Sequence, residues 1–266
     1  QEAEASVLTA HCNGILTLDT AEAYGSSQEV IGNFRIKNPE KRFQVITKLK
    51  PGVKFASSVD FYSHFLNNLG ILNSATLEAY LFHSFYSYSS FEHWHVLEKL
   101  RSDGLVRNIG VSVYSCAEAA IVAEDSRIGI VQLPFNLFDN YSQKGDVLRL
   151  LKSRKKEIHV RSVFLQGLFF KERTSVTGRL FPLKRYLEQI DRLSEDCEIA
   201  LADLALGYVL KQPLVDKVLI GVDNAGQLVG NLEAIGRIQK LDEKLFFQAG
   251  AIHVEEKELL NPANWI

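Results

Sequence analysis

The stretch Ile15–Gly25, ILTLDTAEAYG, decides the fold, because a short apolar run ends there in a carboxylate, Asp19, and a phenol, Tyr24, follows five residues later. A run of apolar and β-branched residues bounded by polar ones is typical of a short buried strand. Enzymes built on parallel barrels place their reacting groups just beyond the carboxyl ends of such strands. The stretch therefore predicts a strand of an α/β fold with Asp19 and Tyr24 at its functional end.

The same pattern recurs along the chain, where four later apolar runs end at Lys48, His83, Ser112 and Gln132. The predicted strands cover residues 15–19, 43–48, 77–83, 106–112, 129–133, 157–163 and 216–221. Helix-like segments with apolar residues at three- and four-residue spacing separate them, and such alternation predicts parallel strands joined by crossovers. A (β/α)8 barrel needs about 250 residues. We therefore expect residues 1–266 to form one barrel domain.

Composition limits the partners that we expect. A net charge of -2 gives no field that would attract nucleic acid, and 46% hydrophobic residues provide for a large core. No apolar stretch approaches the roughly 20 residues of a membrane span, and no secretory signal opens the chain. The cysteines Cys12, Cys116 and Cys197 are widely spaced and odd in number, which favours free thiols. We expect a cytoplasmic protein.

Six motifs, taken in order, resemble those of the aldo-keto reductases. They are Asp19–Gly25, the strand ending at Lys48, the strand ending at His83, residues 104–112 (GLVRNIGVS), residues 131–136 (VQLPFN), and residues 218–222 (VLIGV) with Gln227, Leu228 and Asn231. The resemblance implies a (β/α)8 barrel that reduces a carbonyl with a nicotinamide cofactor. Members of the family begin with a strand, whereas here the helix-like Glu2–Cys12 comes first. We therefore expect that the sequence omits the first barrel strand. It also contains no methionine, and we expect that methionines have been left out as well.

Four residues carry the expected chemistry. Reduction requires a hydride on carbon and a proton on the developing oxyanion, and by resemblance Tyr24 supplies the proton. A neighbouring cation, Lys48, lowers the pKa of a phenol by favouring its phenolate, and Asp19 balances the charge of a buried ammonium. His83 would orient the carbonyl oxygen. We predict that Asp19, Tyr24, Lys48 and His83 lie together.

The resemblance also implies a cofactor site. Ser112 and Gln132 correspond to residues that bind the nicotinamide carboxamide, and Arg161 and Ser162 to the stacking position and the pyrophosphate segment. Gly221, Gln227 and Asn231 belong to the segment that binds the adenosine phosphates. NADP(H) is expected by resemblance, with NAD(H) as the alternative.

Three positions depart from the family pattern. Val113 stands where many members have Asn, Arg161 occupies the position of the stacking aromatic residue, and Gln227 stands where an Arg often binds the 2′-phosphate. An Arg plane can stack on an aromatic ring, so the change at Arg161 affects the expected cofactor geometry more than cofactor binding.

Other functions remain open at this point. A nucleotide-sensing regulatory protein on the same fold, with little turnover, is the main alternative to a reductase of small aldehydes, ketones or sugar-like carbonyls. A barrel hydrolase or isomerase that uses Asp19 and Lys48 is the third, because a barrel alone does not fix function. The segment His93–His95 offers two histidines without a third ligand, so no metal site is expected.

Overall fold

Seven β-strands alternate with helices in residues 2–265, the part of the chain that the computed structural model describes. The strands are β1 (Thr17–Asp19), β2 (Gln44–Leu49), β3 (Leu77–Phe82), β4 (Val106–Ser112), β5 (Ile130–Pro134), β6 (Glu157–Arg161) and β7 (Lys217–Val218). Each falls on one of the predicted runs, and the ends differ by no more than a few residues. The pattern of short apolar runs was therefore sufficient to locate the strands.

The chain divides into two compact units, which are described separately. Unit 1 comprises the residues through Val113 together with Ile121–Gln132 and Val222–Val229, and unit 2 comprises Tyr114–Ala120, Leu133–Gly221 and the residues from Gly230 on. The expectation of one barrel domain over residues 1–266 stays a prediction.

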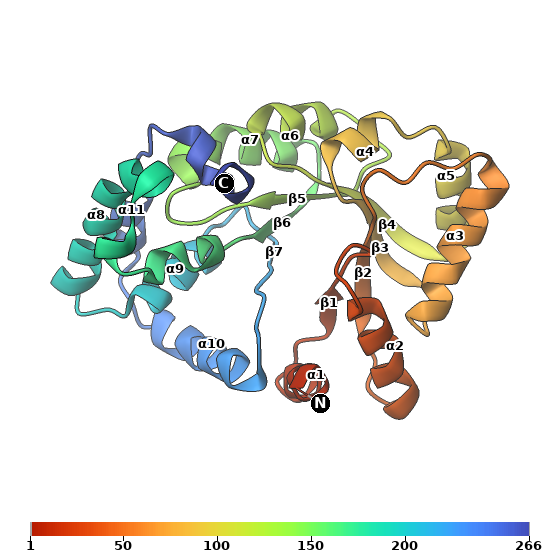
Figure 1. The fold of residues 1–266 in the computed structure, drawn as a ribbon, viewed down its shortest axis with the longest axis horizontal. Helices are drawn as coiled ribbons and strands as arrows, with labels where there is room; N and C mark the ends of the chain where they lie inside the picture. The colour runs from red at the N-terminus through yellow and green to blue at the C-terminus, as the bar shows by residue number, and fades with distance from the viewer. Residues whose placement is uncertain (1, 266) are drawn as a thin grey trace. The chain divides into compact units, whose positions relative to one another are not determined.

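In unit 1, strands β1 to β5 pair in sequence order, and every pair is parallel. Helices α2 (Ser27–Lys37), α3 (Ser58–Ile71) and α5 (Trp94–Ser102) lie along the strands on one side (Figure 1). This unit also contains α1 (Glu2–Cys12) and the short α4 (Phe85–Ser89). Helix α6 (Cys116–Ala123) and strand β5 begin in one unit and end in the other. The parallel pairing brings the carboxyl ends of these strands to one edge of the sheet.

Helix α3 illustrates why these segments form. Ser57 caps its amino terminus by accepting a hydrogen bond from the Asp60 N–H at 3.1 Å. Phe61, Phe65 and Leu69 follow at intervals of four residues and are buried, as expected for the inward face of an amphipathic helix.

Gly110, in the middle of β4, allows the strands to pack closely. A Cβ atom at this position would lie 2.8 Å from the Ile130 carbonyl oxygen and 2.9 Å from Leu81 Cγ. Neighbouring Ile46, Ala79, Leu81 and Ile130 form a buried apolar cluster on the same sheet. The strands that lead to the carboxyl edge of this sheet are therefore tightly packed.

In unit 2, β6 and β7 pair in parallel through His159 with Lys217 and Val160 with Val218. Its helices are α7 (Tyr141–Ser153), α8 (Lys184–Asp196), α9 (Leu201–Leu210), α10 (Ala225–Ile238, which starts in unit 1) and α11 (Glu243–Gly250). Short 3₁₀ turns occupy η1 (Leu165–Phe170), η2 (Arg173–Ser175), η3 (Gly178–Leu183), η4 (Lys257–Leu260) and η5 (Pro262–Asn264). The rings of Phe135 and Tyr208 stack in its core with their centroids 5.6 Å apart.

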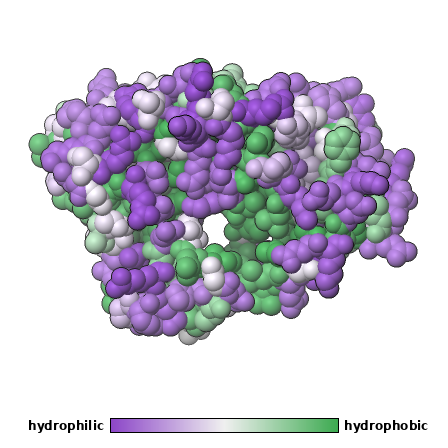
Figure 2. Space-filling view, turned by 180° about the vertical axis from the view of Figure 1, so that it is seen from behind, coloured by the Kyte–Doolittle hydropathy of each residue, from purple (hydrophilic) through white to green (hydrophobic). Residues whose placement is uncertain are grey.

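Hydrophilic side chains cover most of the face seen in Figure 2, in keeping with the 23% of charged residues in the sequence. Among the described residues, the helices are all too short or too polar to span a bilayer.

Candidate active site

The polar residues predicted at strand ends lie at the carboxyl edge of the sheet in unit 1. Asp19 is the last residue of β1, Lys48 is the last but one of β2, and His83 directly follows β3. Ser112 ends β4 and pairs in register with Gln132 of β5. The parallel arrangement thus gathers side chains that are far apart in the sequence.

Asp19 and Lys48 form a buried ion pair. The Lys48 ammonium donates to Asp19 Oδ1 and also to the Thr20 carbonyl oxygen at 3.0 Å. Its side chain is 1% exposed and that of Asp19 is 17% exposed. A buried ammonium is costly unless it is paired, so Asp19 is the group that allows a charged Lys48 at this depth.

Tyr24 lies against both Lys48 and His83. The Lys48 Nζ atom is 5.1 Å from the centroid of the phenol ring, and the imidazole of His83 meets the ring edge-on at 5.3 Å between centroids. Tyr24 is 46% exposed, so its side chain is accessible from solution. The structure therefore brings Asp19, Lys48, Tyr24 and His83 together as the sequence predicted, whereas their catalytic roles stay a proposal.

Glu22 is a buried acid that the sequence analysis did not select. Its Oε1 accepts a hydrogen bond from the Tyr80 hydroxyl at 2.6 Å, and its Oε2 lies 3.0 Å from His64 Nε2 and 3.1 Å from the Lys50 N–H. Its side chain is 8% exposed. Burial, followed by the charge of Glu22 and the hydrogen bond to it, raises the pKa of Tyr80 well above its usual value. Glu22, which is two residues before Tyr24 in the sequence, therefore makes three polar contacts.

Gln132 and Ser112 are both buried at the same edge of the sheet. The side-chain Nε2 of Gln132 donates to Asp19 Oδ2 at 2.9 Å. The backbone carbonyl oxygen of Gln132 accepts from the Val113 N–H at 2.8 Å. The side chain that was predicted to meet the cofactor is thus also a direct neighbour of the Asp19 carboxylate.

Arg161 and Ser162 lie at the end of β6 in unit 2. The guanidinium of Arg161 stacks on the ring of Tyr114 at 4.3 Å, and its Nη1 donates to Ser162 Oγ at 3.3 Å. Within residues 2–265, its buried Nη2 atom has no hydrogen-bond partner. Such an orphaned buried donor is suited to an acceptor from a ligand.

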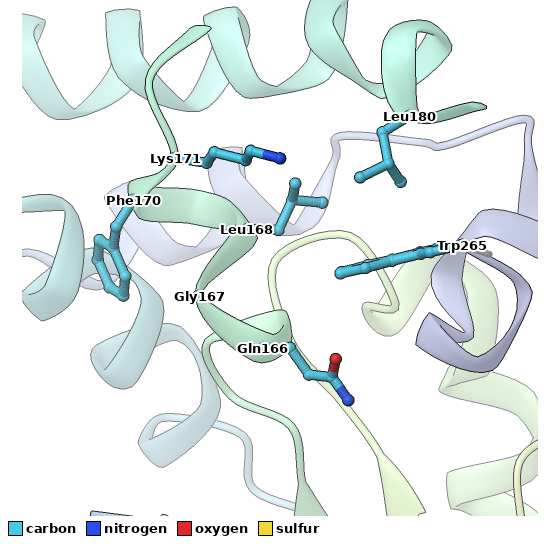
Figure 3. Close-up of a pocket in the computed structure, with 7 residues that line it drawn as sticks. All are labelled: Gln166, Gly167, Leu168, Phe170, Lys171, Leu180 and Trp265. Carbon is cyan, nitrogen blue, oxygen red and sulfur yellow. The ribbon is translucent and has the colours of Figure 1, made fainter. Parts of the chain in front are cut away.

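The segment after Arg161 has an unusual backbone. Ser162, Leu165 and Gln166 have φ values of 62°, 46° and 50°, and Gly167 has a φ of 78°. Left-handed conformations are costly for residues with a side chain and are often found at functional sites. Next to them is a cavity of about 380 Å³ lined by Gln166, Gly167, Leu168, Phe170, Lys171, Leu180 and Trp265. Lys171, Leu180 and Trp265 point into it, whereas Phe170 points away (Figure 3).

Gln227 lies in the first turn of α10. Its Oε1 accepts from the Asp223 N–H at 2.9 Å, its Nε2 lies 3.2 Å from Asp223 Oδ2, and its own N–H donates to Asn224 Oδ1 at 2.9 Å. Gly221 precedes the helix and is exposed, and Asn231 is half-buried within it. The amide of Gln227 is thus engaged by an acidic neighbour at the position where the sequence predicted a phosphate contact.

The two histidines of the segment His93–His95 both contact Ser58. Ser58 Oγ lies 3.3 Å from His93 Nδ1 and 3.0 Å from His95 Nε2. Among residues 2–265, no group of three or more metal-ligating side chains is found. Both histidines are therefore polar partners of Ser58, the first residue of α3.

Comparisons with known proteins identify the family of the chain. A sequence model described as the aldo/keto reductase family matches residues 1–248. The chain is 26% identical over 258 residues to the aldo-keto reductase YhdN of Bacillus subtilis (strain 168), covering 84% of this chain and 75% of that protein. It is 23% identical over 254 residues to the uncharacterized oxidoreductase YqkF of the same organism, with 87% and 81% covered.

Solved structures show the fold. The holo form of aldo-keto reductase AKR11C1 from Bacillus halodurans superimposes with a TM-score of 0.75 at 17% identity, covering 96% of this chain and 89% of that one. Glycerol dehydrogenase AKR11B4 from Gluconobacter oxydans gives a TM-score of 0.69 at 20% identity, with 95% and 87% covered. The predicted (β/α)8 barrel class is confirmed, and the chain belongs to the aldo/keto reductase family.

Proposed function

We propose that the protein is an NAD(P)H-dependent oxidoreductase that reduces an aldehyde, a ketone or a sugar-like carbonyl to an alcohol, with Tyr24 as the general acid. Membership of the aldo/keto reductase family supports an oxidoreductase. The role of Tyr24 as the general acid is supported by one observation: the Lys48 ammonium, paired with Asp19, lies against the ring of Tyr24. The proposed substrate is a small molecule, and the proposed location is the cytoplasm.

The four residues divide the chemistry among them. Tyr24 donates a proton to the oxygen of the reduced carbonyl, and its exposed ring is accessible to a substrate. Lys48 stabilises the phenolate that proton donation leaves behind, because an opposite charge nearby favours the ionised form. Asp19 keeps Lys48 charged in its buried position, and His83 donates a hydrogen bond to the substrate oxygen as negative charge develops there.

The residues present fit a nicotinamide cofactor. The buried Nη2 donor of Arg161 and the left-handed backbone from Ser162 to Gly167 provide donors next to a cavity that also holds the Lys171 ammonium. When bound, NADPH or NADH would supply the hydride. We propose that Ser112 and Gln132 hold its carboxamide and that Arg161 and Ser162 hold the nicotinamide and pyrophosphate. Gly221, Gln227 and Asn231 would contact the adenosine end.

Cofactor titration followed by a substrate panel tests the proposal. NADPH and NADH are titrated separately while protein fluorescence is followed, and aldehydes, ketones and reducing sugars are then supplied with the tighter-binding cofactor while nicotinamide absorbance is recorded. We expect saturable binding and carbonyl-dependent oxidation of the cofactor. Binding without turnover on any carbonyl would favour a nucleotide-sensing protein, and absence of binding would overturn both readings.

A further inference from the structure

We infer that Glu22, held by Tyr80 and His64, is a positioning residue that fixes the loop carrying Tyr24. The inference rests on the proposed role of Tyr24 as the general acid. Nothing in the comparisons assigns a role to Glu22, Tyr80 or His64.

The loop between β1 and α2 is fastened firmly at both ends. At its start, the Thr20 N–H donates to the Ile46 carbonyl oxygen at 2.8 Å, and Lys48 Nζ donates to the Thr20 carbonyl oxygen. At its far end, the hydroxyls of Thr20 and Ser27 are 2.6 Å apart. Between these points, the backbone of Tyr24 makes turn contacts to Ala21 and Ser27 at 3.0 and 3.1 Å. Glu22 adds a support of its own in the middle of the loop.

Glu22 provides this support from three directions. Tyr80 comes from β3, His64 from α3, and the Lys50 N–H from the residue after β2. The Glu22 N–H in turn donates to the Lys48 carbonyl oxygen at 3.1 Å. Because hydrogen bonds to an ionised acceptor are stronger than neutral ones, a buried carboxylate with several donors holds its backbone tightly. Tyr24 is two residues away and cannot shift far while Glu22 is held.

The expected consequence is a change in turnover and not in binding. Proton transfer requires the phenol oxygen within hydrogen-bond reach of the substrate oxygen, and a displacement of about 1 Å can cost on the order of a hundredfold in rate. Glu22 is itself part of the loop, and Tyr80 and His64 hold its side chain from β3 and α3. None of the three is proposed to touch the substrate. Their loss should therefore lower kcat and leave the substrate KM nearly unchanged.

Tyr80→Phe is the sharpest variant, because it removes one oxygen and keeps the ring that packs edge-on against Phe65 at 5.2 Å between centroids. Tyr186→Phe is its matched control, since Tyr186 is also buried and donates its hydroxyl to a carboxylate, that of Glu256, at 2.9 Å. We expect Tyr80→Phe to lower kcat about tenfold and Tyr186→Phe to leave it within about twofold. Amide hydrogen exchange at Glu22 and Tyr24 should be about tenfold faster in Tyr80→Phe only.

A double variant separates positioning from general destabilisation. If Tyr80 acts through Tyr24, then Tyr80→Phe causes no further loss of kcat in a Tyr24→Phe background. Unchanged exchange at residues 20–27, an unchanged kcat in Tyr80→Phe, or an equal loss in Tyr186→Phe would each overturn the positioning role. Unchanged turnover in Tyr24→Phe alone would instead overturn the proposed function, so the two failures are distinguishable.

Discussion

The side-chain amide of Gln132 donates a hydrogen bond to Asp19 Oδ2 at 2.9 Å, whereas Lys48 donates to Asp19 Oδ1. Each carboxylate oxygen of Asp19 therefore has its own donor. Sequence resemblance assigned Gln132 to the nicotinamide carboxamide, and its Oε1 acceptor is still suited to that role. We infer that this one residue connects the proposed cofactor site with the Asp19–Lys48 ion pair.

The ion pair leads to a prediction about stability. Asp19→Asn leaves the 1% exposed Lys48 side chain without its charge partner, and removal of one member of a buried pair costs about 3 kcal/mol. The double variant Asp19→Asn, Lys48→Met should regain most of the lost free energy of unfolding because no buried charge remains. Urea denaturation of the three proteins measures this. A double variant as unstable as the single one would show that an uncompensated Lys48 charge is not the cause of the loss.

The acid role of Tyr24 predicts a separation of binding from turnover. Tyr24→Phe keeps the ring that packs against His83, so cofactor dissociation constants should change less than threefold, roughly. Turnover should fall by about a hundredfold or more, because the proton donor is lost. Steady-state kinetics and fluorescence titration on the same preparation give both values. Turnover equal to that of the parent would remove Tyr24 from the mechanism.

Much of this site could be predicted from the sequence because it depends on local patterns. Asp19, Lys48 and His83 each end a short apolar run, and parallel pairing then brings them together. Glu22 could not be found in this way, since its partners His64 and Tyr80 lie 42 and 58 residues away and a single sequence carries no signal for such pairs. The stacking of Arg161 on Tyr114 is a contact of the same long-range kind.

Close packing of α2 against the end of α3 predicts opposite effects at two glycines. A Cβ atom at Gly32 would lie 2.0 Å from the Ile71 carbonyl oxygen, whereas one at Gly70 meets no atom within 4 Å. Gly32→Ala should lower the free energy of unfolding by at least about 2 kcal/mol through overpacking. Gly70→Ala should raise it by about 0.5 kcal/mol, because alanine favours helix. Equal effects in thermal or urea denaturation would contradict the packing described for α2.

Asp125 predicts a specific loss of stability in acid. Burial alone would raise its pKa, but hydrogen bonds from Arg127, helped by the Tyr88 hydroxyl, lower the pKa to about 2 from a usual 3.8. A carboxylate with a lowered pKa stabilises the fold above its unfolded pKa, and the contribution is lost as the pH falls from about 4 toward 2. Because the pair is partly exposed, we expect only about 1 kcal/mol.

Asp125→Asn measures this contribution directly. The variant should be less stable than the parent by that amount at pH 6, and the difference should shrink as the pH is lowered toward 3. Urea denaturation at both pH values gives the comparison. A difference that is the same at pH 6 and pH 3 would mean that the charge of Asp125 contributes nothing.

The contacts of Gln227 predict a weak preference between NADPH and NADH. Both the amide oxygen and the amide nitrogen of Gln227 are engaged by Asp223, so the position offers a 2′-phosphate no cation and places a carboxylate beside it. An Arg there would add a charge-assisted contact worth about 1.5–3 kcal/mol. Without it, the preference for NADPH over NADH should stay within roughly a hundredfold, at 1.4 kcal/mol per tenfold.

Dissociation constants for both cofactors, measured in one buffer, decide the matter. Gln227→Arg should tighten NADPH about tenfold or more and leave NADH nearly unchanged, because only NADPH carries the 2′-phosphate. Asp223→Asn is the companion variant and should tighten NADPH by a smaller factor, since it removes repulsion without adding a cation. A parent preference beyond a thousandfold, with little effect of Gln227→Arg, would mean that another cation such as Lys171 binds the phosphate.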